Sequence, residues 1–318
     1  MKIVFMGTPT FSIPTLTSLI DSGENVVAVV TRPDAPRGRG QRLSPPDAKA
    51  EAERRGVHVL QPSDANDPGF IKTLRSLNPE IIVVAAYGKI LPKEIITLPI
   101  HGCINLHPSL LPKYRGPSPI QWAVLRGEKK TGVTIMRLNE SMDAGPILLQ
   151  KEAAIGEDET AEELGARLST IGAELMVEAV KAIGQGKAVY RDQNDKEATY
   201  APFITKGEGE IDWNKSAEEI RNRIRGLLPW PGAFTFINGK RIKIIKGKVE
   251  KSTQSLEAGR SAAPGTITGV SHEGIRVATG RDDLVIHELQ EEGKRETNAR
   301  EFLLGHKISV GTICGRQH

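Results

Sequence analysis

Residues 80–116 read EIIVVAAYGKILPKEIITLPIHGCINLHPSLLPKYRG. Two apolar runs in this stretch, Glu80–Ala86 and Gly102–Leu106, have the length and composition of buried strands. Further apolar runs precede them at Lys2–Met6 and Val26–Val30, with helical patterns at Ile13–Ile20, Pro46–Arg55 and Pro68–Leu77. Strands that alternate with helices form parallel βαβ units, so the sequence predicts a Rossmann-like α/β domain with a mostly parallel sheet.

Three loops follow predicted strands, at Gly7–Thr10, Tyr87–Lys89 and His107–Gly116. Ligands of such sheets bind beyond the carboxyl ends of the strands, so we expect the three loops to line one rim. The first loop lacks the G-x-G-x-x-G pattern of dinucleotide sites and is interpreted as an ordinary strand-to-helix turn.

The stretch Asn105–Gly145 combines polar side chains with rigid backbone. Asn105, His107 and Asp143 can donate hydrogen bonds, move protons and stabilise an oxyanion. The residues between them that favour a fixed loop are Pro108, Pro112, Gly116, Pro117 and Pro119. A fixed loop with these polar groups predicts a preformed active site. No metal site is expected, because the histidines lack zinc-type spacing, and no G-x-S-x-G or Walker motif occurs.

The segment Arg32–Pro46 reads RPDAPRGRGQRLSPP and holds four arginines, four prolines and two glycines. It is not expected to form a regular element. A long loop inside a compact α/β domain is often functional, and its arginines can contact phosphates. The alternative is a solvated connection without a ligand.

The C-terminal third changes character. After a strand at Ile147–Ala154 and a helix at Thr160–Ile183 capped by Thr160, a further helix is predicted at about Ser216–Arg225. Short apolar runs separated by Gly and Asn turns then predict a small OB-like β-barrel domain. Its most basic strand, Lys240–Lys251, is interpreted either as a nucleic-acid surface or as a solvated edge strand.

Length and charge suggest two domains. Our boundaries are 1–189 for the catalytic domain, 190–205 for a linker and 206–318 for the C-terminal domain. Residues 1–203 hold 24 Lys+Arg and 24 Asp+Glu, whereas residues 204–318 hold 19 and 15, so the whole net charge of +4 lies in the C-terminal third. The sequence has no apolar run long enough to span a bilayer, and its two cysteines are far apart. A cytoplasmic protein with free thiols is expected.

Three motifs resemble a known family: NLHPSLLP at Asn105–Pro112, YRG at Tyr114–Gly116 and DAGPI at Asp143–Ile147. Together they are similar to the signature of the 10-formyltetrahydrofolate-dependent formyltransferases. The resemblance implies that Asn105, His107 and Asp143 are catalytic and that 10-formyltetrahydrofolate is the formyl donor, without a metal. It also implies folate contacts from two segments, namely Ala85, Ala86, Tyr87 and Gly88, then Ser109, Leu110, Leu111 and Pro112.

Members of this family that formylate the α-amino group of methionyl-initiator tRNA have a C-terminal barrel and an Arg-rich insertion, and this sequence resembles them in both. Three C-terminal segments also match: Tyr200–Ile204, Gly209–Trp213 and Leu227–Gly232. On this interpretation the tRNA contacts are Arg32, Arg37, Arg39, Arg42, Lys240, Arg241, Lys243, Lys246 and Lys248. The family expectation is a monomer.

Three alternatives stay open. A nucleotide-sugar formyltransferase uses the same donor and can carry a similar C-terminal domain, although the Arg-rich segment argues against it. A folate deformylase hydrolyses the same donor without an amine acceptor. A non-catalytic RNA-binding protein with an inactive α/β domain is disfavoured by the presence of Asn105, His107 and Asp143 together.

Overall fold

The computed structural model describes residues 1–37, 42–251 and 262–316. The chain divides into two compact units: residues 1–119, 130–154 and 165–202 form the first, and residues 120–129, 155–164 and 203–318 form the second. Each unit is described by itself. The domain boundaries drawn from the sequence stay a prediction.

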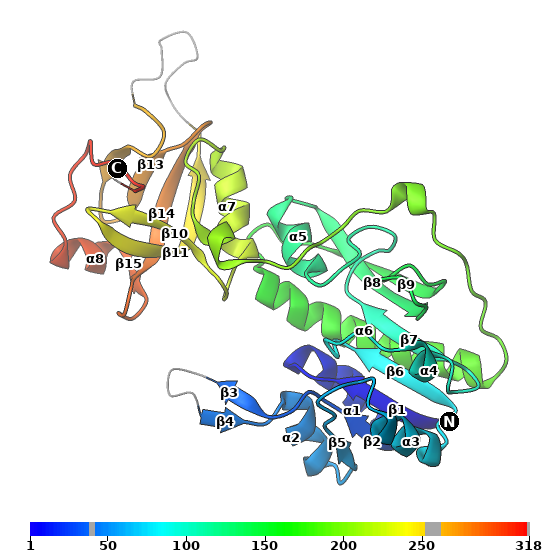
Figure 1. Cartoon of the computed structure of the whole chain (residues 1–318). Helices are drawn as coiled ribbons and strands as arrows, with labels where there is room; N and C mark the ends of the chain where they lie inside the picture. Colours follow the sequence, from blue (N-terminus) through cyan, green and yellow to red (C-terminus); the bar gives the residue numbers. More distant parts are fainter. Residues whose placement is uncertain (38–41, 252–261, 317–318) are drawn as a thin grey trace. The chain divides into compact units, whose positions relative to one another are not determined.

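Within the described residues, the first unit contains one seven-stranded sheet (Figure 1). In spatial order its strands are β5 (Val59–Leu60), β2 (Asn25–Val30), β1 (Lys2–Gly7), β6 (Ile81–Ala85), β7 (Cys103–His107), β8 (Lys130–Arg137) and β9 (Ile147–Ala154). The pairs from β5 to β7 are parallel, whereas β7–β8 and β8–β9 are antiparallel. The mostly parallel α/β sheet is therefore confirmed, and β8 is a strand that the sequence patterns did not predict.

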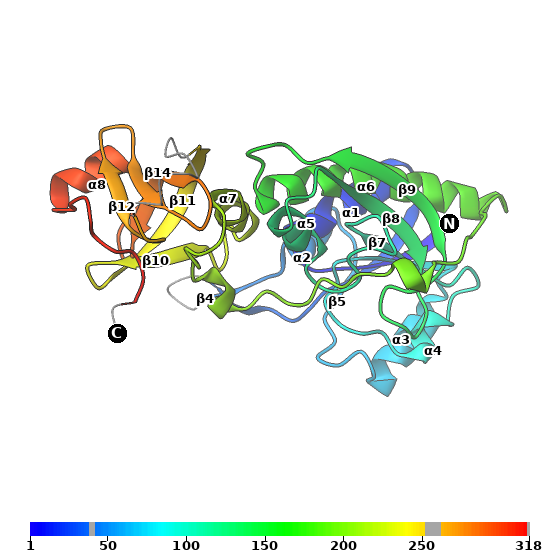
Figure 2. The same cartoon turned by 90° about the horizontal axis from the view of Figure 1, so that it is seen from above.

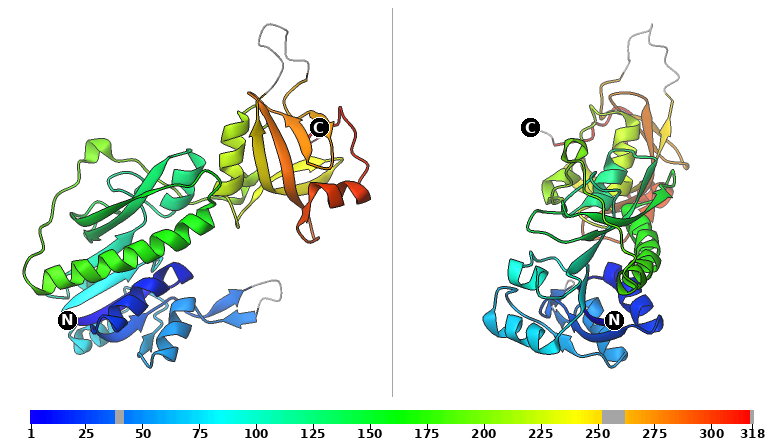
Figure 3. Two further views of the ribbon diagram at one scale, coloured as in Figure 1. Left: turned by 180° about the vertical axis from the view of Figure 1, so that it is seen from behind. Right: turned by 90° about the vertical axis from the view of Figure 1, so that its right-hand side faces the viewer.

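Helices cover both faces of this sheet (Figure 3). They are α1 (Ile13–Asp21), α2 (Asp47–Arg54), α3 (Pro68–Leu77), α4 (Lys93–Ile96) and α6 (Ala161–Gly184). Alternate strand residues point to opposite faces. Val84 and Cys103 pack with Phe70 of α3 and Ile95 of α4, while Leu106 lies against α6 at Gly172. Thr160 and Glu163 exchange hydrogen bonds in a capping box, which confirms the predicted start of α6.

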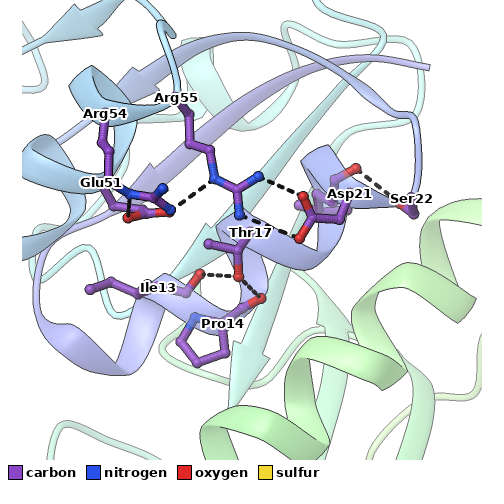
Figure 4. A network of polar contacts seen from close by, with 9 residues as sticks. Ile13, Pro14, Thr17, Asp21, Ser22, Glu51, Arg54 and Arg55 are labelled. Atoms are coloured by element: carbon purple, nitrogen blue, oxygen red, sulfur yellow. Dashed lines mark hydrogen bonds and ion pairs between the residues drawn. The ribbon is translucent and has the colours of Figure 1, made fainter.

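Polar contacts fix α2 to α1 (Figure 4). The Arg55 guanidinium, just beyond α2, lies 2.6 Å from the Asp21 carboxylate of α1 and 3.1 Å from Glu51. Arg54 forms a second ion pair with Glu51 at 2.6 Å. These partly exposed pairs orient α2, from which Lys49 reaches the base of the neighbouring hairpin.

Two stretches of the Arg-rich segment form strands in the described residues, so the expectation that it contains no regular element was wrong. Strands β3 (Ala35–Arg37) and β4 (Arg42–Ser44) pair as an antiparallel hairpin. Pro36 lies opposite Leu43. Every second pair of a two-stranded antiparallel ribbon makes no ladder hydrogen bond, so a proline can occupy such a position without loss.

The second unit contains a separate antiparallel sheet, also as expected. Its strands are β10 (Ala233–Ile237), β11 (Lys240–Glu250), β14 (Asp283–Glu291), β13 (Ile275–Ala278) and β12 (Ile267–Val270) in spatial order, with β15 (Thr297–Asn298) beside β14. The helices of this part include α5 (Pro119–Leu125), α7 (Ala217–Gly226) and α8 (Ala299–Gly305). Ile220 and Ile224 of α7 are buried in the sheet's apolar core. Figure 2 shows α7 beside β11. In the part of the chain that the structure describes, no helix is long and apolar enough to cross a membrane.

The carboxyl ends of β1, β6 and β7 lie at one edge of the first sheet, because these three strands are adjacent and parallel. The Thr8 hydroxyl donates to the Tyr87 carbonyl at 3.0 Å, which joins the loops after β1 and β6. The expected common rim for the three loops is therefore confirmed.

Candidate active site

Strand β7 presents Asn105 and His107 on the same face of the sheet. The two residues are separated by one position, and side chains two residues apart in a strand point the same way. Leu106, between them, points to the opposite face and packs on α6. The spacing Asn-x-His therefore directs both polar side chains to one side while the strand stays anchored in the core.

The imidazole of His107 is buried, with 4% of the residue exposed. Its Nε2 lies 2.9 Å from the carbonyl oxygen of Tyr114. A carbonyl oxygen can only accept, so Nε2 carries the hydrogen. The other ring nitrogen, Nδ1, lies 3.7 Å from Oδ1 of Asp143. Nδ1 is thus the ring nitrogen that faces the carboxylate and is available for chemistry.

Asp143 occupies a demanding backbone conformation, with φ of 50° in the left-handed region. Its Oδ2 accepts a hydrogen bond from the Gly116 N–H at 2.8 Å, which leaves Oδ1 toward His107. Two residues on, a Cβ at Gly145 would lie 1.8 Å from the Arg137 carbonyl oxygen, so only glycine fits there. The Asp143–Gly145 turn is therefore fixed against β8.

The Asn105 side chain differs from its neighbours in having no internal partner. Asn105 is half-buried, and its amide forms no hydrogen bond with the residues that the structure describes. Its N–H groups are free to donate to a ligand. The structure therefore brings His107 and Asp143 together directly and places Asn105 beside His107 on the same strand face.

Hydrogen bonds from side chains of β8 and β9 hold the loop Ser109–Pro112 in place. The Thr134 hydroxyl donates to the Ser109 carbonyl at 2.6 Å and accepts from the Leu111 N–H at 3.2 Å. Gln150 donates to the Leu111 carbonyl at 2.9 Å. Ser109 and Leu111 are buried, whereas Leu110 and Pro112 are partly exposed. The latter two are the positions of this loop that a ligand can reach.

The segment Ala85–Gly88 lies beside this loop, because Ala85 of β6 pairs with Leu106 of β7. Ala86 and Gly88 are exposed and have positive φ, whereas Ala85 and Tyr87 are buried. Burial raises the pKa of the Tyr87 phenol, whose hydroxyl has no hydrogen-bond partner in the described residues. A ligand here would meet the backbone of Ala86 and Gly88.

The arginines of the hairpin segment separate into two groups. The Arg32 guanidinium lies over Gly88, where a Cβ would be 3.6 Å from its Cζ, so Arg32 belongs to the rim. Arg39 lies outside the described residues, and the structure describes only the backbone of Arg37 and Arg42. Their predicted tRNA contacts stay a prediction.

A polar bracket holds the base of the hairpin. Lys49 of α2 lies 3.0 Å from the Asp34 carboxylate, and Gln61 donates to Asp34 at 2.8 Å. The Gln61 hydrogen bond, followed by that of Lys49, lowers the pKa of Asp34. The Asp34 carboxylate therefore stays ionised at neutral pH, and its contacts fix where the hairpin leaves the domain.

Two basic residues at the start of β11 are matched by local acids. Lys240 lies 2.9 Å from Glu291 and Arg241 lies 3.5 Å from Glu292. The Arg241 guanidinium also lies 3.9 Å from the ring centroid of Phe234. These contacts give both residues a structural role in the sheet.

Farther along β11 the basic residues are less engaged. Lys243 donates to the Pro229 carbonyl at 3.2 Å. Lys246 and Lys248 are exposed and form no ion pair with any residue in the described ranges. Of the five basic strand residues predicted to bind tRNA, these two keep their charge most available.

The described residues contain no group of three or more His, Cys, Asp or Glu side chains that could hold a metal ion. A surface hollow of about 460 Å³ is lined by Asn66, Pro68, Ile71, Lys72, Arg75 and Glu94. It contains none of the predicted catalytic side chains, so its size does not make it the active site.

Sequence reasoning missed the residues that support the site. Gln193 donates to the carbonyl oxygens of Asp143 at 2.8 Å and Gly145 at 2.7 Å, from the segment interpreted as a linker. Thr134 and Gln150 were missed as well. No local motif marks these residues, because each acts on a backbone group distant in sequence.

Comparison with known proteins assigns this fold to a class of group-transfer enzyme. Residues 1–180 match the family model for formyl transferase, and residues 203–307 match the model for the formyl transferase C-terminal domain. The chain belongs to the formyl transferase family.

Within this family the chain is similar to methionyl-tRNA formyltransferases over nearly its full length. That of Caldanaerobacter subterraneus subsp. tengcongensis is 50% identical over 314 residues, which cover 98% of this chain and 99% of the relative. That of Thermodesulfovibrio yellowstonii is 49% identical over 309 residues, with 97% of each chain covered.

Solved structures share the fold at lower identity. The methionyl-tRNA formyltransferase from Clostridium thermocellum superposes with a TM-score of 0.57 at 22% identity, covering 79% of this chain and 94% of that one. The N-formyltransferase from Helicobacter canadensis, in complex with folinic acid and dTDP-3-aminofucose, gives 0.67 at 19% identity, covering 90% and 99%.

Proposed function

We propose that this protein transfers the formyl group of 10-formyltetrahydrofolate to the free α-amino group of methionyl-initiator tRNA. The observation that carries the proposal is the similarity to methionyl-tRNA formyltransferases over nearly the full length of the chain, including the C-terminal unit. The pair formed by buried His107 and partly buried Asp143, with Asn105 two positions before His107 on the same strand face, supports a formyl-transfer site. We expect the enzyme to act in the cytoplasm as a monomer.

The chemistry requires a neutral amine and a stabilised oxyanion. The amine attacks the formyl carbon, a C–N bond forms, and negative charge develops on the formyl oxygen. The unpartnered Asn105 amide donates to that oxygen. His107 contributes through Nδ1, which donates in the doubly protonated ring and accepts in the neutral ring, because Nε2 is held by the Tyr114 carbonyl.

Proton transfer completes the reaction without a covalent enzyme intermediate. Asp143, directly or through water, accepts the proton that the attacking nitrogen loses. The tetrahedral intermediate collapses, the bond between the formyl carbon and N10 of the folate breaks, and N10 gains a proton. One proton leaves the amine and one reaches N10, so the site returns to its starting state.

The folate is expected along the rim. In this proposal the donor contacts the accessible parts of two segments, Ala85–Gly88 and Ser109–Pro112, while their buried members shape the loops. One loop is held by Thr134 of β8 and the other by Thr8. These fixed loops suit the bicyclic pterin part of the folate, because the loops lose little conformational entropy on binding.

The acceptor is expected to bind through phosphate contacts. Arginines of the β3–β4 hairpin and the free lysines of β11 provide positive charge on regular elements. A nucleotide-sugar acceptor carries only the charge of one diphosphate and would need far less positive charge than a tRNA. The basic residues therefore favour a polyanionic acceptor.

One assay separates the readings. Purified protein is mixed with 10-formyltetrahydrofolate and, in separate arms, charged methionyl-initiator tRNA, an amino-sugar nucleotide, or no acceptor. Formylmethionyl-tRNA in the first arm alone supports the proposal. Formyl transfer only to the amino sugar, or formate release without an acceptor, would replace it with a nucleotide-sugar formyltransferase or a deformylase.

A further inference from the structure

The segment 193–201 is hydrogen-bonded to the loop that follows β7. The Thr199 hydroxyl accepts from the Tyr114 N–H at 2.9 Å, and the Thr199 carbonyl accepts from the Arg115 N–H at 2.8 Å. The Ala201 N–H donates to the Arg115 carbonyl at 2.8 Å. These contacts join the loop that follows β7 to a segment about eighty residues later in the chain.

Gln193 connects this layer to the catalytic carboxylate. Its side-chain nitrogen lies 2.8 Å from the carbonyl oxygen of Asp143 and 2.7 Å from that of Gly145. Its side-chain oxygen accepts from the Arg115 guanidinium at 3.1 and 2.8 Å. The amide nitrogen therefore binds the Asp143–Gly145 turn, and the amide oxygen binds the loop that follows β7.

The residue type is determined by these partners. Two carbonyl oxygens require N–H donors, and a guanidinium requires an acceptor. Glutamine supplies both from one side chain, whereas glutamate offers only acceptors when ionised and asparagine is one methylene shorter. The Arg115 side chain is nearly fully buried and is oriented further by Asp195 at 2.7 Å.

The turn that Gln193 binds sets the direction of the Asp143 side chain. Its φ of 50° is unfavourable for a residue other than glycine and persists only where neighbouring groups determine it. Gln193 binds the backbone on both sides of this turn, while Gly116 binds Oδ2. Oδ1 thereby stays directed at Nδ1 of His107.

We propose that Gln193, fixed by Arg115, is a positioning residue for formyl transfer that sets the direction of the Asp143 carboxylate. It does not touch the reacting atoms in this role. The inference rests on the proposed function for its kinetic consequence, but its structural content, the hold on Asp143, is independent of which acceptor is used.

The test compares three variants with the full-length wild type. Gln193→Ala removes both contacts, and Gln193→Glu keeps the acceptor for Arg115 but loses the donor to the two carbonyls. The matched control is Lys196→Ala, an exposed residue of the same segment whose side chain makes no contact with the catalytic loop in the described residues. Thermal unfolding of all proteins records any general loss of stability.

We expect both Gln193 variants to lower kcat roughly 10- to 100-fold, because small misplacement of a catalytic group has costs of this order. KM for folate and for tRNA should change less than about twofold, because a uniform loss of binding would instead raise KM. Lys196→Ala should match the wild type. A merely structural role would lower the unfolding midpoint without separating kcat from KM.

A second readout does not depend on activity. Hydrogen exchange of the Gly116 amide, measured by NMR, reports its bond to Asp143 Oδ2. Faster exchange at Gly116 in both Gln193 variants but not in Lys196→Ala supports the inference. Unchanged exchange together with kcat within twofold of wild type would overturn it. If Gly116 exchanges faster in both Gln193 variants but the wild type does not formylate the tRNA, the proposed function is overturned. The hold of Gln193 on Asp143 is supported in that case.

Discussion

Nδ1 of His107 faces Oδ1 of Asp143 across 3.7 Å, while Nε2 of the same ring lies 2.9 Å from the Tyr114 carbonyl. The backbone carbonyl fixes the ring's orientation and the position of one hydrogen. The gap to the carboxylate exceeds a direct hydrogen bond, so a reacting oxygen or a water can lie near both groups. This geometry differs from a closed ion pair, in which both groups would be occupied with each other.

Replacement of any of the three proposed catalytic residues should remove most turnover. Asn105→Ala deletes the unpartnered amide donor, and loss of one oxyanion donor typically costs roughly 100- to 1000-fold in kcat. His107→Ala and Asp143→Ala should have effects of at least similar size. Steady-state kinetics of formylmethionyl-tRNA formation measures each value, with circular dichroism as the check on folding. A variant with near-normal kcat would exclude its residue from the catalytic set.

The arginine hairpin should govern use of the tRNA and not of the folate. Arg42→Ala should raise KM for tRNA more than KM for 10-formyltetrahydrofolate, because a phosphate contact is lost. Arg54→Ala, an exposed arginine of α2 paired with Glu51, is the matched control. If Arg37, Arg39 and Arg42 are all neutralised and KM for tRNA does not change, the assignment of these arginines to tRNA binding is refuted.

The basic strand should act through Lys246 and Lys248, which form no ion pair within the described residues. Substitution of both Lys246 and Lys248 by alanine should weaken tRNA binding and reduce the slope of log K against log salt by about one for each lost phosphate contact. Lys240→Ala should have a smaller effect on that slope, because Lys240 is neutralised by Glu291. Filter binding between about 50 and 200 mM salt gives the slopes. Equal salt slopes for the wild type and both variants would show that the tRNA binds to other residues.

The α/β fold could be predicted because the central parallel strands and most helices of the first unit carry a local pattern. Runs such as Ile81–Ala85 are apolar throughout, and Thr160 marks the start of α6 by its own side chain. Strand β8 was missed because the Pro-rich residues before it dominate the stretch. The β3–β4 hairpin was missed for a related reason: whether a proline interrupts pairing depends on its register, which the local sequence does not reveal.

The candidate catalytic groups could be selected from the sequence because their chemistry is visible in the residue types and in a motif. The supporting groups could not. Gln193 lies 50 positions from Asp143 and contacts its backbone carbonyl, which every residue possesses. Nothing in the sequence near position 193 indicates that partner. The difference between paired Lys240 and unpaired Lys246 likewise depends on neighbouring strands and not on composition.

Arg225 of α7 should be important for stability. It is 6% exposed, and its guanidinium donates to Asn222 Oδ1 at 2.9 Å and to the Glu159 carbonyl at 3.0 Å, with the Gly156 carbonyl at 3.3 Å. Burial lowers the pKa of this guanidinium, which nevertheless stays charged at neutral pH. Arg225→Ala leaves these acceptors unsatisfied, so we expect a loss of roughly 2–4 kcal/mol.

Urea unfolding measures this loss, provided that a single transition is seen. Arg295→Ala removes an exposed arginine of the same unit and should change stability by less than about 0.5 kcal/mol. A loss for Arg225→Ala no larger than for this control would show that solvent satisfies the acceptors.

Both cysteines should be unreactive in the native protein. Cys103 is 0% and Cys314 is 4% exposed, and burial raises the pKa of each thiol from 9.0 to about 12. Because the thiolate is the reactive form, a thiol reagent at about pH 8 should modify neither residue quickly, whereas urea-unfolded protein should react at both. The raised pKa values also mean that this contribution to stability is fully present below pH 9 and is lost as the pH rises toward 12. Rapid native-state labelling, assigned with Cys103→Ala and Cys314→Ala, would show that the corresponding part of the core opens readily.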